Sequence, residues 1–296
     1  MITQKNADAR VVVRSDAYRL ALTYVEVSDS ARELEQSHLC GPTAGLIQSE
    51  ALAGVALLGQ ELSDPDETVT FRLDVDGPIG GFLVEANGKG DLRGYTRVKV
   101  LNEFDGLDEP DLSQALGEHG TVEIIRSKPG LLEDCARAEV NPPSVARALE
   151  QYYGASLQRQ VAVRLATLDA NNYICTARGL LLECMPDGDK GKFERARAYF
   201  EDTTIQSFLE ENIPLNEICR LLGMDKPVYS EPMPLRFACH CSVERVEAML
   251  ACLSVPELSA MIDAGNPAQI YCHLCGKGYS IGIDRLKALR ETLKHK

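Results

Sequence analysis

The stretch Phe237-Ala-Cys-His-Cys-Ser242 and its counterpart Cys272-His-Leu-Cys-Gly-Lys-Gly-Tyr279 decide how the end of this chain folds. Each contains two cysteines at short spacing, C-x-C in the first stretch and C-x-x-C in the second. Zn²⁺ prefers a tetrahedron of thiolates, and two pairs that are already local need only one loop closure to bring four sulfur atoms together. The sequence therefore predicts a metal site with four ligands: Cys239, Cys241, Cys272 and Cys275.

Two other interpretations of these cysteines stay open. They could be two unrelated buried pairs, although Gly276 and Gly278 provide the backbone freedom that a metal-binding turn needs. His240 and His273 could themselves be ligands, although four sulfurs already fill a tetrahedron. Four thiolates around Zn²⁺ carry a formal charge of about −2. Basic side chains nearby in the sequence are expected to offset it: Arg236, Arg245, Lys277, His240 and His273.

The C-x-C spacing also indicates redox chemistry. Two cysteines separated by one residue can form a disulfide only across a small, strained ring, and strained disulfides behave as labile, regulatory bonds. Such a site can hold a metal when its thiols are reduced and become two local disulfides when they are oxidised.

Length, composition and cysteine usage indicate a two-domain protein from a reducing compartment. The chain has 296 residues, of which 45% are hydrophobic and 25% charged, as in soluble globular proteins. A secreted disulfide scaffold would be shorter and denser in cysteine, the first residues lack the apolar region of a signal peptide, and no apolar run could span a membrane. We therefore expect a cytoplasmic location. Six further cysteines are expected to be small buried residues: Cys40, Cys135, Cys175, Cys184, Cys219 and Cys252.

The charge distribution argues against nucleic acid as a partner. The formal net charge is −13. Residues 231–296 hold eight Lys/Arg and seven Asp/Glu, so residues 1–230 hold 23 Lys/Arg against 37 Asp/Glu. Binding to phosphates needs a basic face, which this acidic body does not supply.

Residues 10–186 show strand signals with helices inserted between them. Residues 10–27 predict one or two strands, and Ser28 or Asp29 is expected to cap a short polar helix. Residues 42–62 are apolar on most sides, which predicts a deeply buried helix. Ser144 is expected to cap another helix. Alternation and turns predict strands at 68–75, 81–86, 92–101, 120–126, 159–167 and 173–184. This order predicts an α+β fold with a mixed antiparallel sheet-and-helix domain.

The chain is expected to have three parts: a core domain over 1–186, an amphipathic helical linker over 187–234 and a zinc domain over 235–296. The linker is too polar for a core of its own and too apolar to be free in water, so it should lie weakly on the first domain. The last part, with helices predicted at 242–253, at 256–262 and from 284, has only about sixty residues, so a metal should supply much of its stability.

These residues resemble a known family, the redox-regulated 33 kDa heat-shock chaperones, also called 33 kDa chaperonins. The resemblance is most specific at Phe-x-Cys-x-Cys-Ser-x-Glu-Arg, residues 237–245, and at Ile-x-Cys-x-x-Cys-Gly-x-x-Tyr, residues 270–279. It extends over nearly the whole chain. Other matching positions are Asp76-Gly77-Pro78, Val84-Glu-Ala-Asn87, Arg93-Gly-Tyr95, Tyr152-Tyr153 and Met185-Pro186.

The resemblance implies a chaperone that holds unfolding proteins without ATP and is not an enzyme. It implies one Zn²⁺ per chain in a reduced, inactive form, with Cys239, Cys241, Cys272 and Cys275 as ligands. It further implies that oxidants convert these ligands into Cys239–Cys241 and Cys272–Cys275 disulfides, that zinc leaves, and that the small domain and the linker unfold. Unfolding client proteins would be the partners, with a homodimer in the oxidised form and neither nucleic acid nor membrane.

Two other classes of function compete with this interpretation. A thiol–disulfide oxidoreductase would use one cysteine pair as its redox couple, but such pairs usually lie in a βαβ frame that is not predicted here. An adaptor protein could use the four cysteines for structure alone. We expect the client surface on the linker face of Phe193, Phe200 and Phe208 and on the sheet that this face covers, although simple packing explains these side chains equally well.

Overall fold

The structure, a computed structural model, describes residues 7–107, 110–170 and 173–294. It divides into two compact units, Met1–Ala238 and Cys239–Lys296. The segment 187–234 lies in the first unit, and the division falls after Ala238 rather than before residue 235. Residues 1–6, on which part of the prediction about a signal peptide depends, lie outside the described residues.

The first unit contains an antiparallel sheet in the strand order β10-β1-β2-β9-β8, and β11 also pairs with β1. Its strands are β1 (Ala9–Ser15), β2 (Leu20–Glu26), β8 (Gln160–Ala170), β9 (Tyr173–Cys184), β10 (Val228–Tyr229) and β11 (Met233–Pro234). The central strand β2 is buried along nearly its whole length. Both faces of this sheet are therefore covered.

The second sheet of the first unit has the order β12-β5-β4-β3-β6-β7. Its strands are β3 (Thr68–Val75), β4 (Gly81–Asn87), β5 (Asp91–Thr96), β6 (Gly120–Lys128), β7 (Leu131–Val140) and β12 (Arg236–Phe237). Buried and half-buried residues alternate along β3, β4 and β5, so one face packs inward. The strand predicted at 92–101 ends at Thr96. Sequence patterns missed β7, most of which is exposed and whose inward-facing side chains are mainly small, Ala136 and Ala138.

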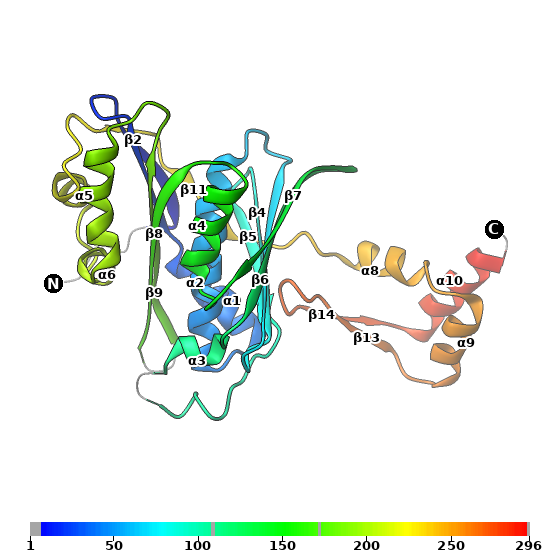
Figure 1. Cartoon of the computed structure of the whole chain (residues 1–296). Coiled ribbons are helices and arrows are strands. Elements are labelled where there is room, and N and C mark those ends of the chain that lie inside the picture. Colours follow the sequence, from blue (N-terminus) through cyan, green and yellow to red (C-terminus); the bar gives the residue numbers. More distant parts are fainter. Residues whose placement is uncertain (1–6, 108–109, 171–172, 295–296) are drawn as a thin grey trace. The chain divides into compact units, whose positions relative to one another are not determined.

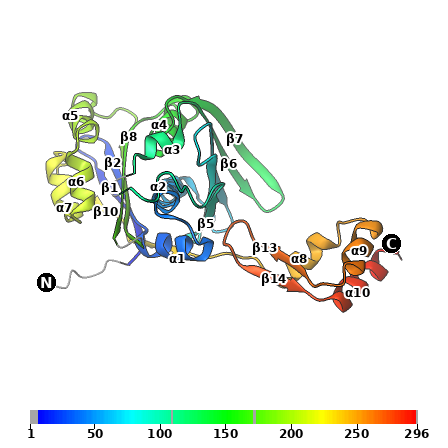
Figure 2. The same ribbon diagram turned by 90° about the horizontal axis from the view of Figure 1, so that it is seen from below.

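Helices fill the space between the two sheets (Figures 1 and 2). They are α1 (Ser28–His38), α2 (Pro42–Leu58), α4 (Val145–Ala155), the short α3 (Leu112–Leu116) and the 3₁₀ turn η1 (Gly59–Glu61). Nearly every residue of α2 is buried, as its apolar sequence predicts, and α2 contacts β9 on one side and β4 and β5 on the other. None of the described helices is both long enough and apolar enough to cross a membrane.

The helix caps show where local sequence suffices and where it does not. The hydroxyl of Ser144 accepts a 3.1 Å hydrogen bond from the backbone N–H of Arg147, so the predicted cap of α4 is confirmed. The predicted cap of α1 by Ser28 or Asp29 is wrong. The carboxylate of Asp8 accepts from the first backbone N–H groups of α1 instead, at 3.1 and 2.7 Å. A residue far upstream therefore caps this helix.

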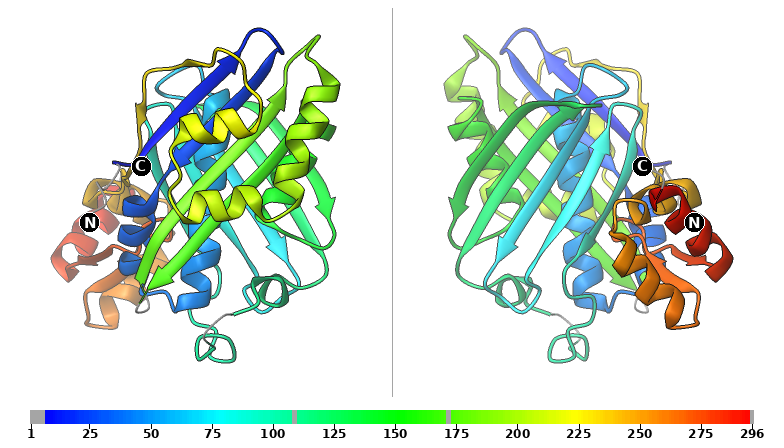
Figure 3. Two further views of the ribbon diagram at one scale, coloured as in Figure 1. Left: turned by 90° about the vertical axis from the view of Figure 1, so that its left-hand side faces the viewer. Right: turned by 90° about the vertical axis from the view of Figure 1, so that its right-hand side faces the viewer.

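Three linker helices cover the outer face of the first sheet (Figure 3, left). They are α5 (Lys190–Glu201), α6 (Thr204–Glu210) and α7 (Leu215–Leu221). Phe193 and Phe200 are buried in a cluster with residues of the sheet, and Phe208 packs against the cluster half-buried. Arg178 of β9 donates a 2.6 Å hydrogen bond to the carbonyl of Leu209, at the end of α6. The linker thus shares its core with the first sheet.

The second unit is built on a hairpin, β13 (Ala268–Tyr271) and β14 (Gly278–Ile281), and on the helices α8 (Val243–Leu250), α9 (Val255–Asp263) and α10 (Ile283–Lys294). The predicted positions of its helices are confirmed within a few residues. Its core, among the described residues, is small and consists of six buried side chains: Val246, Leu250, Leu258, Tyr279, Ile281 and Leu286. A core of this size stabilises a fold only marginally.

Candidate metal centre

The C-x-x-C pair lies in the turn that joins β13 to β14. The backbone N–H of Cys272 donates to the carbonyl of Lys277 at 2.9 Å, and the N–H of Gly276 donates to the carbonyl of Cys272 at 2.8 Å. Gly276 has a φ of +70°, a conformation that glycine adopts without strain. Gly278, by contrast, belongs to β14 and has no positive φ, so only the first of the two glycines serves the turn in the predicted way.

The C-x-C pair lies between strand β12 and helix α8. Cys239 begins the second unit, and Cys241 immediately precedes Ser242, whose hydroxyl caps α8 by accepting from the N–H of Arg245 at 3.3 Å. The N-terminus of a helix favours negative charge nearby, so this position suits a thiolate.

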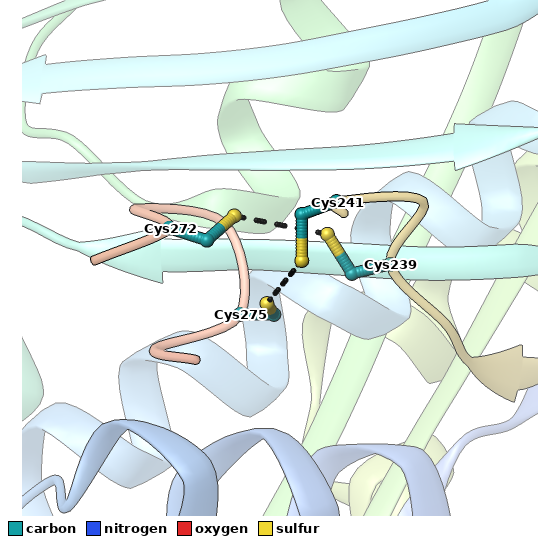
Figure 4. A group of neighbouring side chains, drawn as sticks. All are labelled: Cys239, Cys241, Cys272 and Cys275. Carbon is teal, nitrogen blue, oxygen red and sulfur yellow. Dashed lines mark hydrogen bonds between the residues drawn. The ribbon is translucent and has the colours of Figure 1, made fainter. Parts of the chain in front are cut away.

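The two pairs meet, and their four sulfur atoms all lie within 4.8 Å of one another (Figure 4). The Sγ atoms of Cys239 and Cys272 are 3.8 Å apart, and those of Cys241 and Cys275 are 3.4 Å apart. A Zn²⁺ tetrahedron with Zn–S bonds of about 2.3 Å has sulfurs separated by about 3.8 Å. The described residues therefore offer a set of four thiol donors at the spacing that zinc requires. Neither His240 nor His273 belongs to this group.

Hydrogen bonds and burial shift the pKa values of Cys241 and Cys275 in opposite directions. The hydroxyl of Tyr279 donates to Sγ of Cys241 at 3.0 Å. Burial by itself would raise the pKa of Cys241, but hydrogen bonds from Tyr279 and the neighbouring sulfurs outweigh it and lower that pKa. Burial raises the pKa of Cys275. A shared ion would favour the deprotonated form of all four, because only the thiolate is a strong metal ligand.

The charge compensation predicted from the sequence needs one correction. Arg236 forms a 2.6 Å ion pair with Asp91 in the first unit, so its guanidinium already has an anionic partner there. Lys277 lies in the second unit with its ammonium nitrogen 5.4 Å from the centre of the Tyr279 ring. The lysine therefore stays close to the tyrosine that contacts Cys241.

Most of the remaining cysteines are not the buried residues that were predicted. Cys219 is buried, but Cys135, Cys175 and Cys252 are exposed, and Cys40 and Cys184 are half-buried. Burial raises the pKa of Cys40 to about 11, which leaves little reactive thiolate at neutral pH. None of these six cysteines belongs to the cluster of four. The exposure of a cysteine therefore does not identify the metal ligands.

Comparison with known proteins places this arrangement in a family. A family model described as Hsp33 protein matches residues 8–282. The chain belongs to the Hsp33 family. Its relatives in this family include a 33 kDa chaperonin of Bacillus licheniformis, 25% identical over 270 residues, which cover 90% of this chain and 93% of the relative. A 33 kDa chaperonin of Staphylococcus carnosus is 28% identical over 279 residues, covering 91% of this chain and 93% of that protein.

The fold is also that of a solved member of the Hsp33 family. The crystal structure of the 33 kDa chaperonin, a heat shock protein 33 homolog, from Thermotoga maritima superposes with a TM-score of 0.87 at 20% identity, covering 98% of this chain and 100% of that one. The predicted α+β fold with a small C-terminal four-cysteine domain is therefore confirmed. The resemblance that the cysteine motifs indicate is confirmed as well.

Proposed function

We propose that this protein is an ATP-independent chaperone of the Hsp33 family whose activity is controlled by the redox state of its four clustered cysteines. Two observations support a chaperone rather than an enzyme: the match to the family model over residues 8–282 and the name 33 kDa chaperonin that its relatives carry. The proposal of redox control rests on a single observation. The four sulfur atoms of Cys239, Cys241, Cys272 and Cys275 lie within 4.8 Å of one another.

In the reduced protein the four cysteines would hold one Zn²⁺, which cross-links the start of α8 to the β13–β14 turn. Among its described residues the second unit has a core cluster of six buried side chains, so this cross-link would be a main source of its stability. Zinc-binding free energy in small peptides is about 10–16 kcal/mol, more than such a core can supply. Fold and metal site would therefore be lost together.

Oxidation would use the same sulfur atoms. We assign the disulfides to the two local pairs, Cys239–Cys241 and Cys272–Cys275. Each pair loses two electrons as its S–S bond forms, and one molecule of hydrogen peroxide takes up those electrons and two protons as its O–O bond breaks, giving two water molecules. A sulfur in a disulfide is a poor ligand, so the donor set would be lost and the second unit would unfold.

The linker is the second component of the switch. Phe193 and Phe200 are buried against the first sheet in this structure, where they can touch no client. If the linker detaches when the second unit unfolds, these side chains and the outer face of the first sheet become available to unfolding proteins. Their packing role is visible in the structure, and their client role, with that of Phe208, is part of the proposal. Dimerisation in the oxidised state and a cytoplasmic location belong to it too.

The test is light scattering from a thermally unfolding client protein, with zinc release measured in parallel. Reduced protein should carry one zinc per chain and leave client aggregation unchanged. Treatment with peroxide and mild heat should release the zinc and suppress aggregation without ATP. Equal suppression by the reduced and oxidised forms would exclude redox control, and absence of suppression in both would exclude the chaperone function. Catalytic turnover of a small disulfide substrate would favour the oxidoreductase.

A further inference from the structure

The chain covers one edge of the second sheet with its own backbone just before the first cysteine. Strand β12 pairs in parallel with β5, which would otherwise be the edge strand. The N–H of Arg236 donates to the carbonyl of Gly90 at 3.0 Å, and the N–H of Ala238 donates to the carbonyl of Leu92 at 3.0 Å. An unpaired edge of this kind readily accepts another extended chain.

The side chains of this segment fill an apolar site beside β5. Leu235 is 6% exposed and belongs to the main core of the first unit, and Phe237 packs against the same core. Helix α1 forms a further contact with β12. Gly90 has a φ of +85°, and a Cβ at this position would lie 2.1 Å from the carbonyl oxygen of Pro234. The turn before β5 thus leaves room for an incoming backbone.

A buried charge adds selectivity to this edge. The Asp91 side chain is 3% exposed, whereas the Arg236 side chain is 70% exposed. Nε of Arg236 lies 2.6 Å from Oδ1 of Asp91, and the amide of Asn87 donates to Oδ2 at 3.0 Å. A carboxylate fixed in this position favours a basic residue between the two apolar ones.

We propose that the edge of β5 is a client-binding site, which residues 235–238 of the chain itself occupy until the cysteine unit unfolds. The occupant would be an extended segment of an unfolded protein in which a basic residue stands between two apolar residues, the pattern of Leu235-Arg236-Phe237. This inference rests on the proposed function, because it needs clients and a release step. It adds the location of the site and the chemistry that the site recognises.

Residues 235–238 can be released from the edge of β5 because the pairing between β12 and β5 is short. Only residues 236–237 form strand β12, and Cys239 follows after one more residue. Residues 235–238 are tethered by β11, which pairs with β1, and are anchored on the other side by the folded second unit, so they compete with a client at an effective concentration on the order of millimolar. Once the second unit unfolds, this segment loses its anchor on one side, and a client strand can add to the edge by β-augmentation.

The experiment uses the full chain and a fluorescein-labelled peptide with the sequence of residues 232–238, Pro-Met-Pro-Leu-Arg-Phe-Ala. Fluorescence anisotropy should show binding to the oxidised protein and at least about tenfold weaker binding to the reduced, zinc-loaded protein. A peptide with glutamine in place of its arginine should bind the oxidised protein about tenfold more weakly. The unlabelled peptide of residues 232–238 should displace a bound segment of a client protein from the same site.

Matched variants assign the charge preference to one residue. In Asp91→Asn the difference between the arginine and glutamine peptides should disappear. Asp66→Asn, an equivalent change at an exposed carboxylate that pairs with Lys89, should leave the difference intact. The comparison of the two peptides on the unmodified protein stays informative even if Asp91→Asn does not fold. Hydrogen exchange adds a second measurement, since the amides of Arg236 and Ala238 should lose protection on oxidation.

Two results would overturn the inference. One is an oxidised protein that suppresses client aggregation but binds neither peptide, and the other is an oxidised, client-bound protein in which residues 236–238 keep their protection. In both cases the proposed function would stand and only this site would be wrong. If the oxidised protein fails to suppress aggregation at all, the proposed function itself fails, so the two failures are distinguishable.

Discussion

The hydroxyl of Tyr279 donates a 3.0 Å hydrogen bond to Sγ of Cys241 and so joins the two halves of the cysteine cluster. Tyr279 stands on β14, a few residues beyond the C-x-x-C turn, whereas Cys241 precedes α8. Its ring is also part of the small core of the second unit. The same residue therefore packs the fold and contacts a sulfur atom that we assign to the metal.

Tyr279→Phe should loosen the metal site without removing a ligand. The phenylalanine ring keeps the packing, but the hydrogen bond to Cys241 is lost. Loss of such a supporting contact typically lowers metal affinity about tenfold or more. We also expect faster zinc release with peroxide, because a hydrogen bond to a thiolate reduces its nucleophilicity. A chelator competition and a colorimetric zinc assay measure both effects. Tyr271→Phe, on the exposed end of the hairpin, is the control, and identical release rates would refute the role of Tyr279.

Cys272→Ser should abolish zinc retention and unfold the second unit. Three thiolates leave the tetrahedron incomplete, and the six-residue core cannot replace the lost binding energy. Limited proteolysis should then cut within residues 239–294 and, if the linker detaches, within residues 190–221, while the two sheets of the first unit, with the large core between them, stay resistant. Cys252→Ser changes an exposed cysteine of the same unit and should behave like the original protein. Full zinc occupancy in Cys272→Ser would contradict the ligand assignment.

Arg178→Ala should loosen the linker from the first sheet. Arg178 pairs with Glu26 at 2.6 Å and donates to the carbonyl of Leu209, and both charged side chains are nearly buried. Removing one partner of a buried ion pair costs about 3 kcal/mol, because the other charge stays in place. Protease sensitivity within residues 190–221 should rise in the reduced protein.

Arg197→Ala provides the comparison for the linker. Arg197 pairs with Glu201 on the exposed side of α5, where an ion pair contributes about 0.5 kcal/mol or less. The linker of this variant should keep its original resistance to protease. If Arg178→Ala and Arg197→Ala have equal effects, the contact with the end of α6 does not hold the linker.

Glu50→Gln should remove a pH dependence of stability in the first unit. Glu50 is half-buried on α2, and the desolvation of its carboxyl raises the pKa from 4.5 to about 7, which the charge of Arg164 only partly opposes. Between these values the folded state binds more protons than the unfolded state, so stability falls as pH rises from 4.5 to 7. At pH 8 the glutamine variant should be more stable than the original protein by about 2–3 kcal/mol.

Urea unfolding at pH 4 and at pH 8, followed by circular dichroism, measures this difference. At pH 4 the carboxyl is mostly protonated in both states, so the two proteins should have similar free energies of unfolding. Glu33→Gln, at an exposed position of α1, keeps Glu50 and is the control, so its free energy of unfolding should match that of the original protein at both pH values. A gain for Glu50→Gln that is equally large at pH 4 would mean that something other than ionisation is responsible.

Local patterns in the sequence were enough to predict the four-cysteine cluster and most of the elements. The spacing of each cysteine pair forces its two sulfurs to be neighbours, so only one approach, of one pair to the other, was left to the fold. Alternating apolar residues predicted β3 and β4, and the apolar stretch of α2 predicted its burial, because both signals depend on residues a few positions apart. Ser144 could be identified as a cap for the same reason.

Contacts between residues far apart in the chain were decided only by the tertiary structure. The ion pair of Arg236 with Asp91, the cap that Asp8 provides to α1 and the contact of Arg178 with the end of α6 leave no local pattern, because each depends on two elements meeting in the folded chain. The sequence alone determined which atoms could bind a metal and be oxidised. The packing of the chain decided which surfaces its linker and its last strand cover, since burial and pairing are properties of the assembled sheets.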